Sequence, residues 1–232
     1  MNTIGDEVVT VQVLLGGRSD KNAQISLWLA NAYRDLATSI PFETLESTED
    51  HHLPVSLLGE WPPYNRLKYP RDARAIKAVN LGQPAHWPTA WRPIFKRNID
   101  LVDRYTAVNP SVPAIWAPFG RYMVFAPPAN APYPVRIRYW RKVVINKTRL
   151  NDTEIQLPDD WLEIVEYGAA MRGFLDLQQP DRSAAIRTLL YGNVKQPDKP
   201  GLIKQRLTRI QAEYMNANYG MRPRRVRYGF VP

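Results

Sequence analysis

The segment Leu157–Phe174 constrains the fold most, because it combines a helix start with an unusual lack of side-chain bulk. An apolar stretch ends at Pro158, and acidic residues then open a helical period. Asp159 is predicted to accept hydrogen bonds from first-turn amides, with Asp160 and Glu163 near the positive end of the helix dipole. The small residues of the segment are Gly168, Ala169, Ala170 and Gly173. We therefore predict a helix on which another backbone packs closely, and not one that performs chemistry.

Apolar residues at helical spacing predict further helices on both sides of this segment. A first helix is expected from Ile4 to Leu15, closed by Gly16 and Gly17 as a C-terminal stop. The other expected helices are a long one from about Lys21 to Ser39, a short one over Asn98–Thr106, and later ones over Ser183–Tyr191 and about Gly201–Asn218.

The chain between Pro54 and Val144 has a strand-like pattern instead. Alternation of residue types predicts strands over Arg121–Ala126 and Val135–Val143, paired antiparallel through the connection Pro127–Pro132. We predict an α+β fold: an antiparallel bundle of about four helices, a β-rich insertion between its second and third helices, and an extended C-terminal arm. In this bundle the second helix is expected to lie on the small residues of the third.

The distributions of charge and of proline along the chain mark the same division into helical and β-rich segments. The net charge is +9, but residues 51–150 hold 16 basic and only 4 acidic side chains, and 14 of the 21 prolines. The flanking segments are mildly acidic, so the positive charge belongs to a central block and to the tail. The domain hypothesis is a helical bundle from residues 1–50 and 151–218, a basic β-rich insertion over 51–150, and an arm over 219–232.

The sequence contains little that indicates a catalytic or metal-binding site. The chain has no cysteine, no phosphate-binding or nucleophile motif, and three histidines, His51, His52 and His86, which are interpreted as solvated loop residues. Glu163 and Glu166, together with Asp159 and Asp160, could form a carboxylate cluster for glycan hydrolysis, but their place at a helix start already explains most of these acids. We expect no enzyme activity, no metal and no cofactor.

No export signal is evident, and no apolar run is long enough to cross a membrane, so the chain is expected to be soluble and made in a cytoplasm.

The helix-forming segment Leu157–Phe174 resembles the third helix of the head-tail adaptor (connector) proteins of tailed bacteriophages. The order and spacing of other segments, from Gln24 to Tyr214, are similar to that family as well. These segments are Ser26–Ala37, Phe42–Glu46, Tyr69–Asp72, Ala75–Val79 and Gly120–Pro128.

The resemblance implies a virion structural protein of the neck, between head and tail. Such a protein forms a homo-oligomeric ring of twelve copies under the portal protein. The ring extends the DNA channel, passes double-stranded DNA without sequence-specific binding, and offers an attachment surface to the next component, a tail or nozzle/stopper protein. No membrane is involved, and the protein is made in the host cytoplasm.

The basic strand near the end of the β-rich block leaves three interpretations open. Its residues could grip nucleic acid through phosphates and stacking, could be the solvated side of a half-exposed strand, or could face a neighbouring copy or the tail. We take them as candidate inter-subunit or tail interface residues. They are Arg136, Arg138, Trp140, Arg141 and Lys142.

The C-terminal segment from Tyr219 is too short and too rich in Gly, Pro and Arg for a core of its own, yet it retains aromatic residues. Simple disorder is one interpretation; the other is an arm that orders on a partner, which in the similar adaptors is the portal. The candidate portal-docking residues are Arg222, Arg224, Arg225, Arg227, Tyr228 and Phe230.

Two other functions remain as alternatives: a nucleic-acid-binding protein that uses the basic β block, and, more remotely, a tail-associated glycan hydrolase.

Overall fold

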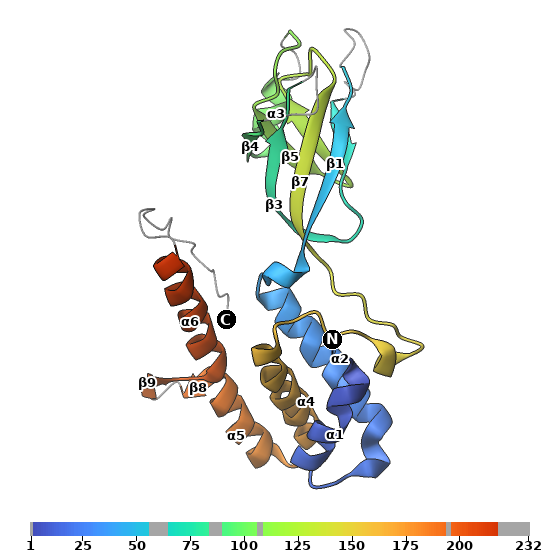
Figure 1. Cartoon of the computed structure of the whole chain (residues 1–232), viewed down its shortest axis with the longest axis vertical. Helices are drawn as coiled ribbons and strands as arrows, with labels where there is room; N and C mark the ends of the chain where they lie inside the picture. The colour runs from blue at the N-terminus through green and yellow to red at the C-terminus, as the bar shows by residue number, and fades with distance from the viewer. Residues whose placement is uncertain (1, 56–64, 84–89, 106–108, 194–195, 218–232) are drawn as a thin grey trace. The chain divides into compact units, whose positions relative to one another are not determined.

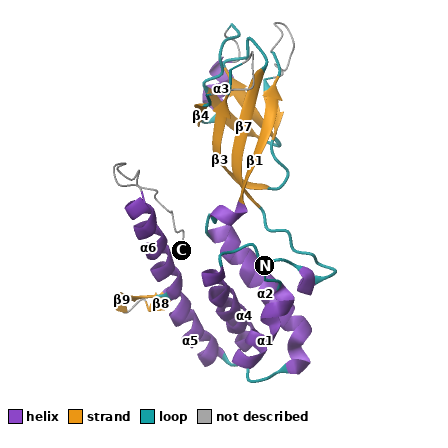
Figure 2. Ribbon diagram, in the orientation of Figure 1, coloured by secondary structure: helices purple, strands orange, loops and turns teal. Residues whose placement is uncertain are grey.

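The computed structural model describes residues 2–55, 65–83, 90–105, 109–193 and 196–217. The chain forms two compact units. The helical unit contains the residues up to Leu36 together with the chain from Ile145 onward, and the sheet unit contains Ala37–Val144. Within the described residues, six α-helices flank and accompany a nearly closed seven-stranded mixed sheet, which confirms the predicted α+β class (Figure 1, Figure 2).

The helical unit is built around one central helix, α4, which packs against α1 and α5. Its helices are α1 (Ile4–Leu14), α2 (Asn22–Ser39, whose last residues belong to the sheet unit), α4 (Leu162–Asp176), α5 (Pro180–Tyr191) and α6 (Leu202–Ala217). A two-stranded antiparallel pair, β8 (Gly192–Asn193) and β9 (Gln196–Pro200), connects α5 to α6.

Both ends of α1 are well defined, and its C-terminal end is the one that the sequence predicts. Thr3 and Asp6 form a reciprocal capping box at its start. Gly16 and Gly17 both have φ near +80°, a conformation that other residues rarely adopt, and they stop the helix.

Helices α2 and α4 approach closely through the glycines of α4, which confirms the predicted packing. A Cβ added at Gly168 would lie 3.1 Å from the Cβ of Ala32, and one at Gly173 would lie 2.8 Å from Cζ3 of Trp28. The Trp28 indole Nε1 also donates to Oδ2 of Asp176 at 2.7 Å. Small residues on α4 therefore make room for the large aromatic side chain of α2.

The predicted capping role of Asp159 is wrong. Residues Asp159–Trp161 form a 3-10 turn, α4 begins at Leu162, and no side chain caps that helix. Because Trp161 is fully buried, it fixes the start of α4 by packing instead.

The sheet unit has seven strands in the order β1-β7-β3-β4-β5-β6-β2, antiparallel except for the parallel pair β4 and β5. The strands are β1 (Glu46–Leu53), β2 (Arg66–Lys68), β3 (Ala73–Leu81), β4 (Arg92–Lys96), β5 (Ile115–Phe119), β6 (Tyr122–Ala126) and β7 (Tyr133–Arg141). Alternate residues of β7, including Val135, Ile137 and Tyr139, enter the sheet's core. The short helix α3 (Ile99–Tyr105) buries Val102 against Ala117 and Ala126 in a second, smaller cluster.

The two predicted strands exist, but the prediction that they pair with each other is wrong. Strand β6 pairs with β5 and β2, whereas β7 pairs with β1 and β3. The connection between them is not a tight hairpin, because it runs beside Ser111, whose N–H donates to Pro128 and whose carbonyl accepts from Asn130. Prolines in this connection supply no N–H for a hairpin ladder. The actual hairpin joins β5 to β6 at Gly120, where φ is positive.

We predict that Ala169→Leu destabilises the protein by about 1–3 kcal/mol, because Ala169 is fully buried in α4 and a larger side chain overpacks the site. Denaturant unfolding of the purified protein measures the change. The matched control is Ala184→Leu at an exposed position of α5, which should change stability little. Equal stability of Ala169→Leu and the wild type would contradict the packing described for α4.

Candidate functional site

The outer face of strands β1, β7 and β3 carries a continuous set of charged and aromatic side chains. The register places Asp50 opposite Arg136 and Glu46 opposite Trp140 across the β1–β7 pair. Because side chains alternate between the faces of a strand, these residues share the side away from the core. We call this surface the charged sheet face; it consists of Glu46, Asp50, Lys77, Arg136, Arg138 and Trp140, together with Trp91, which precedes β4 and contacts Arg136.

At one end of the charged sheet face, Arg136 forms a two-point contact with Asp50. Its Nε and Nη2 atoms each donate to a different oxygen of the carboxylate, both at 2.8 Å. These bonds hold the pKa of Asp50 below its usual value. The same guanidinium lies 4.2 Å from the ring centroid of Trp91, close enough for a cation–π contact.

At the other end, Glu46 lies between two cations. Nε of Arg138 donates to Glu46 Oε1 at 2.7 Å, and Nζ of Lys77 donates to its other oxygen. Burial opposes ionisation of this carboxyl, but the two hydrogen bonds outweigh it and hold the pKa of Glu46 below its usual value. Nζ of Lys77 also lies 5.7 Å from the Trp140 ring centroid.

These contacts show where the predicted interface residues lie. Arg136, Arg138 and Trp140 come together on the charged sheet face, while Arg141 ends β7 and Lys142 follows it. Two of the arginines have carboxylate partners within their own chain, so they offer less net charge to a phosphate backbone than the sequence suggests. The role of all five residues as an interface stays a prediction.

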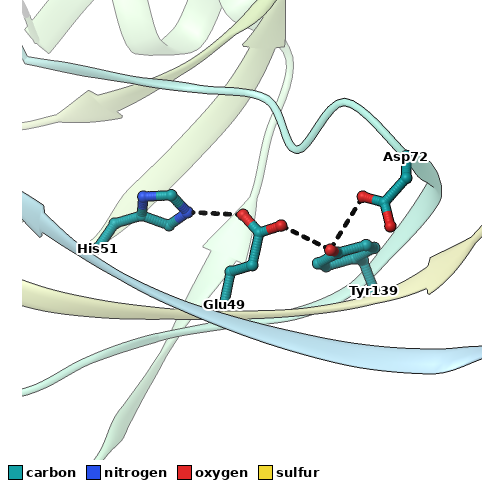
Figure 3. A network of polar contacts seen from close by, with 4 residues as sticks. All are labelled: Glu49, His51, Asp72 and Tyr139. Atoms are coloured by element: carbon teal, nitrogen blue, oxygen red, sulfur yellow. Dashed lines mark hydrogen bonds and ion pairs between the residues drawn. The ribbon is translucent and has the colours of Figure 1, made fainter.

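The inner side of the same strands carries a separate polar network (Figure 3). The Tyr139 hydroxyl lies 2.7 Å from Oε1 of Glu49 and 3.0 Å from Oδ1 of Asp72, and Nε2 of His51 lies 2.9 Å from the other Glu49 oxygen. Burial and the adjacent carboxylates raise the pKa of Tyr139 well above its usual value. Since the four residues come from β1, β7 and the turn before β3, the network ties these strands together.

The histidines are therefore placed differently from the sequence prediction. His51 and His52 lie in strand β1 and not in a loop, and His86 lies outside the described residues. Among the residues that the structure describes, no group of three or more side chains is arranged to hold a metal ion.

The acidic start of α4 is held by a cation from the last helix. Arg206 of α6 contacts Asp160 at 3.2 Å and Glu163 at 3.0 Å. One turn further along, Glu166 is hydrogen-bonded to Glu7 of α1, a residue that is only 8% exposed. Burial and the neighbouring carboxyl of Glu7 raise the pKa of Glu166 to about 7. These acids connect helices, which agrees with a structural interpretation of the cluster.

The candidate portal-docking residues, Arg222 to Phe230, lie outside the described residues. The role of the arm in docking to the portal therefore stays a prediction.

Comparison with known families identifies the class of protein. Residues 2–219 match the sequence profile of a family described as SU10 adaptor protein. The chain belongs to this family. It is a family of phage head-tail adaptors, as the resemblance implied, and the match covers both units described above. A comparison with curated proteins finds no match.

Membership in the SU10 adaptor family fits a structural role in the neck of a phage particle and is consistent with a protein that is not an enzyme. None of the helices in the described ranges has both the length and the apolar character needed to cross a membrane.

We predict that the Glu7–Glu166 pair makes stability depend on pH. Because the pKa of Glu166 is raised in the folded state, its stabilising contribution is complete below its unfolded value near 4.5 and is lost as the pH rises through about 7. Glu166→Gln should therefore be more stable than the wild type at pH 8 and similar to it at pH 5. The gain is on the order of 1 kcal/mol, since solvent screens the half-buried group.

Thermal or denaturant unfolding at a series of pH values measures this effect. The control is Asp160→Asn, which removes the other carboxylate partner of Arg206 and should keep the wild-type dependence of stability on pH between pH 5 and pH 8. If the stability of Glu166→Gln changes with pH as steeply as that of the wild type, the Glu7–Glu166 pair does not titrate in this range.

Proposed function

We propose that the protein is the head-tail connector of a tailed phage, a ring of twelve copies bound under the portal. The observation that carries this proposal is the adaptor-family match over residues 2–219. The ring extends the channel through which DNA passes and gives the tail, nozzle or stopper protein a surface to bind.

The C-terminal arm, residues 219–232, is the proposed portal-docking element. It follows α6, and it carries four arginines and no acid, which favours an acidic groove on the partner. Tyr228 and Phe230 supply apolar anchors, and residues of this kind usually carry most of the binding energy of an interface.

The charged sheet face is the proposed contact with a neighbouring copy or with the tail. Tryptophan and arginine are enriched at protein interfaces, and here Arg138 and Arg136 are already held in position by Glu46 and Asp50. Preordered side chains lose less freedom on binding, so this face is better suited to a protein partner than a set of mobile cations. The internal ion pairs also disfavour the alternative of a nucleic-acid-binding protein, whose cations must be available to phosphates.

The test is attachment of purified protein to portal-bearing heads that lack it. Truncation after Asn218 should leave a folded protein that no longer attaches, because the arm is removed and the bundle is not. The matched comparison is Arg138→Ala with Trp140→Ala, which alters the charged sheet face and keeps the arm. This variant should still bind heads but should form a defective ring or fail to receive tails.

If the truncated protein still completes heads normally, the docking surface lies on the bundle and not on the arm. Failure of the wild-type protein to bind any portal-bearing head would contradict the proposed function itself.

A further inference from the structure

One end of the sheet unit gathers four connections between its elements. Strands β1, β3 and β6 end there, and strands β2, β4, β5 and β7 begin there. The register shows this directly, because it places Leu53 opposite Tyr133 and Leu81 opposite Arg92. The chain enters the sheet unit before β1 and leaves it after β7, both at the opposite end (Figure 1). The four connections therefore lie away from both links to the rest of the chain.

We call the described residues of these connections the loop end. None of them is charged, although 23% of the residues in the whole chain are, and six of them are proline. The other residues of the connections contain one charged residue, Glu60, and one histidine, His86. The loop end consists of residues 54–55, 65, 82–83, 90–91, 109–114 and 127–132.

The exposed part of the loop end is mostly apolar. Val55 is 39% exposed and Val112 is 42% exposed, and Pro54, Ala90 and Pro132 are exposed as well. The polar side chains exposed beside them are asparagine and glutamine amides. The cores of protein–protein interfaces are likewise depleted of charged residues, so this composition suits a protein partner.

A buried asparagine ties two of the connections together. Asn65, which precedes β2, is only 2% exposed. Its Nδ2 donates to the Pro127 carbonyl at 3.2 Å, and its Oδ1 accepts from the N–H of Ala129 at 3.3 Å. The connection into β2 and the connection from β6 to β7 are thus held as one.

The remaining two connections are held in the same way. The Ser111 N–H donates to the Pro128 carbonyl at 2.7 Å, and Nη2 of Arg92, the first residue of β4, donates to the Pro113 carbonyl at 2.8 Å. Proline also fixes the backbone angle φ at its own position. The loop end is therefore ordered before it meets a partner, and an ordered surface loses less freedom on binding.

We propose that the loop end binds an uncharged, apolar surface on the next component of the tail. This inference rests on the proposed connector function and names the surface that receives the tail. It leaves the charged sheet face for the contact between neighbouring copies.

The composition of the loop end argues against nucleic acid and against anionic lipid as the occupant. Both are bound through lysine and arginine, because their phosphates carry negative charge. The loop end contains neither residue, and the cation next to it, Arg92, already donates to a carbonyl. The portal is a poor fit as well, because the basic arm proposed to bind it favours an acidic surface.

A second copy of this chain is also a poor fit. Exposed apolar residues on its helices, such as Val9 (64% exposed) and Leu189 (44% exposed), have a charged residue on the same side of the helix. Asp6 lies one turn before Val9, and Arg182 lies two turns before Leu189. An uncharged partner surface would desolvate these charges and offer them no partner. Contact of the loop end with itself would give a closed pair of copies and not a ring.

The test separates head binding from tail addition. Portal-bearing heads that lack this protein are first completed with the purified variant, and bound copies are counted. An extract that contains the tail proteins, but neither heads nor this protein, is then added, and tailed particles are counted by electron microscopy. The variant that combines Val55→Asp with Val112→Asp should fill heads as the wild type does. It should give at least about tenfold fewer tailed particles, because each new carboxylate is buried without a partner.

The matched control is Phe119→Asp, at a 63% exposed position on the hairpin at the opposite end of the sheet, which should give the wild-type number of tailed particles. Tails on wild-type connectors should also stay attached in about 1 M salt, where contacts between exposed charges are screened.

Normal tail addition to the double variant, or an equal loss in Phe119→Asp, would overturn the proposed docking. A double variant that binds heads without forming a ring would show that the loop end joins copies of this chain. Binding of the wild type to phosphatidylcholine vesicles that the double variant loses would assign the loop end to lipid. Either result would overturn the proposed docking while the connector function stands. Wild-type protein that binds no heads at the first step would refute the connector function and, with it, this docking.

Discussion

The close approach of α2 and α4 is the constraint on which the helical unit depends. Gly168 and Gly173 leave space that Ala32 and Trp28 of α2 occupy, and a single added carbon at Gly173 would lie within 2.8 Å of the Trp28 ring. Trp28 also reaches Asp176 at the far end of α4. Because α4 packs against α1 and α5 as well, an error at this contact would displace both of these helices.

The sheet unit depends on a different interaction, the pairing of acidic β1 with basic β7. Strand β1 has the sequence ESTEDHHL, which contains one aliphatic residue, so it cannot be held by apolar burial alone. Its carboxylates contact Arg136 and Arg138 on the outer side and Tyr139 on the inner side. The net effect is a preordered surface that mixes both signs of charge in place of a purely basic one, and this changes which partners it suits.

The helices could be predicted from the sequence because their signals are local. Apolar spacing, Gly16 with Gly17, and the small residues of α4 each act within a few turns, and the structure confirms them. Strand pairing could not be predicted in the same way, because β7 pairs with β1 and β3, which lie far away along the chain. The alternation that identified β6 and β7 contains no information about their neighbours.

The candidate site could also be predicted only in part, because its residues are distant in the sequence. Sequence analysis found Arg136, Arg138 and Trp140, but the charge count assigned Glu46 and Asp50 to a different, acidic part of the chain. Only the register reveals that these acids are the partners of the arginines. Uncovered apolar residues such as Val9 and Leu189 had no signal of their own, because helical spacing alone does not show which side of a helix stays exposed.

The central claim is that this chain joins a phage head to its tail as a ring on the portal. The most direct measurement is the native mass of the complex formed when purified protein is mixed with its portal, combined with electron micrographs of the same sample. We expect one ring of twelve copies on the tail-facing side of each portal. A portal that binds no copies, or isolated copies that never form a ring, would contradict the account.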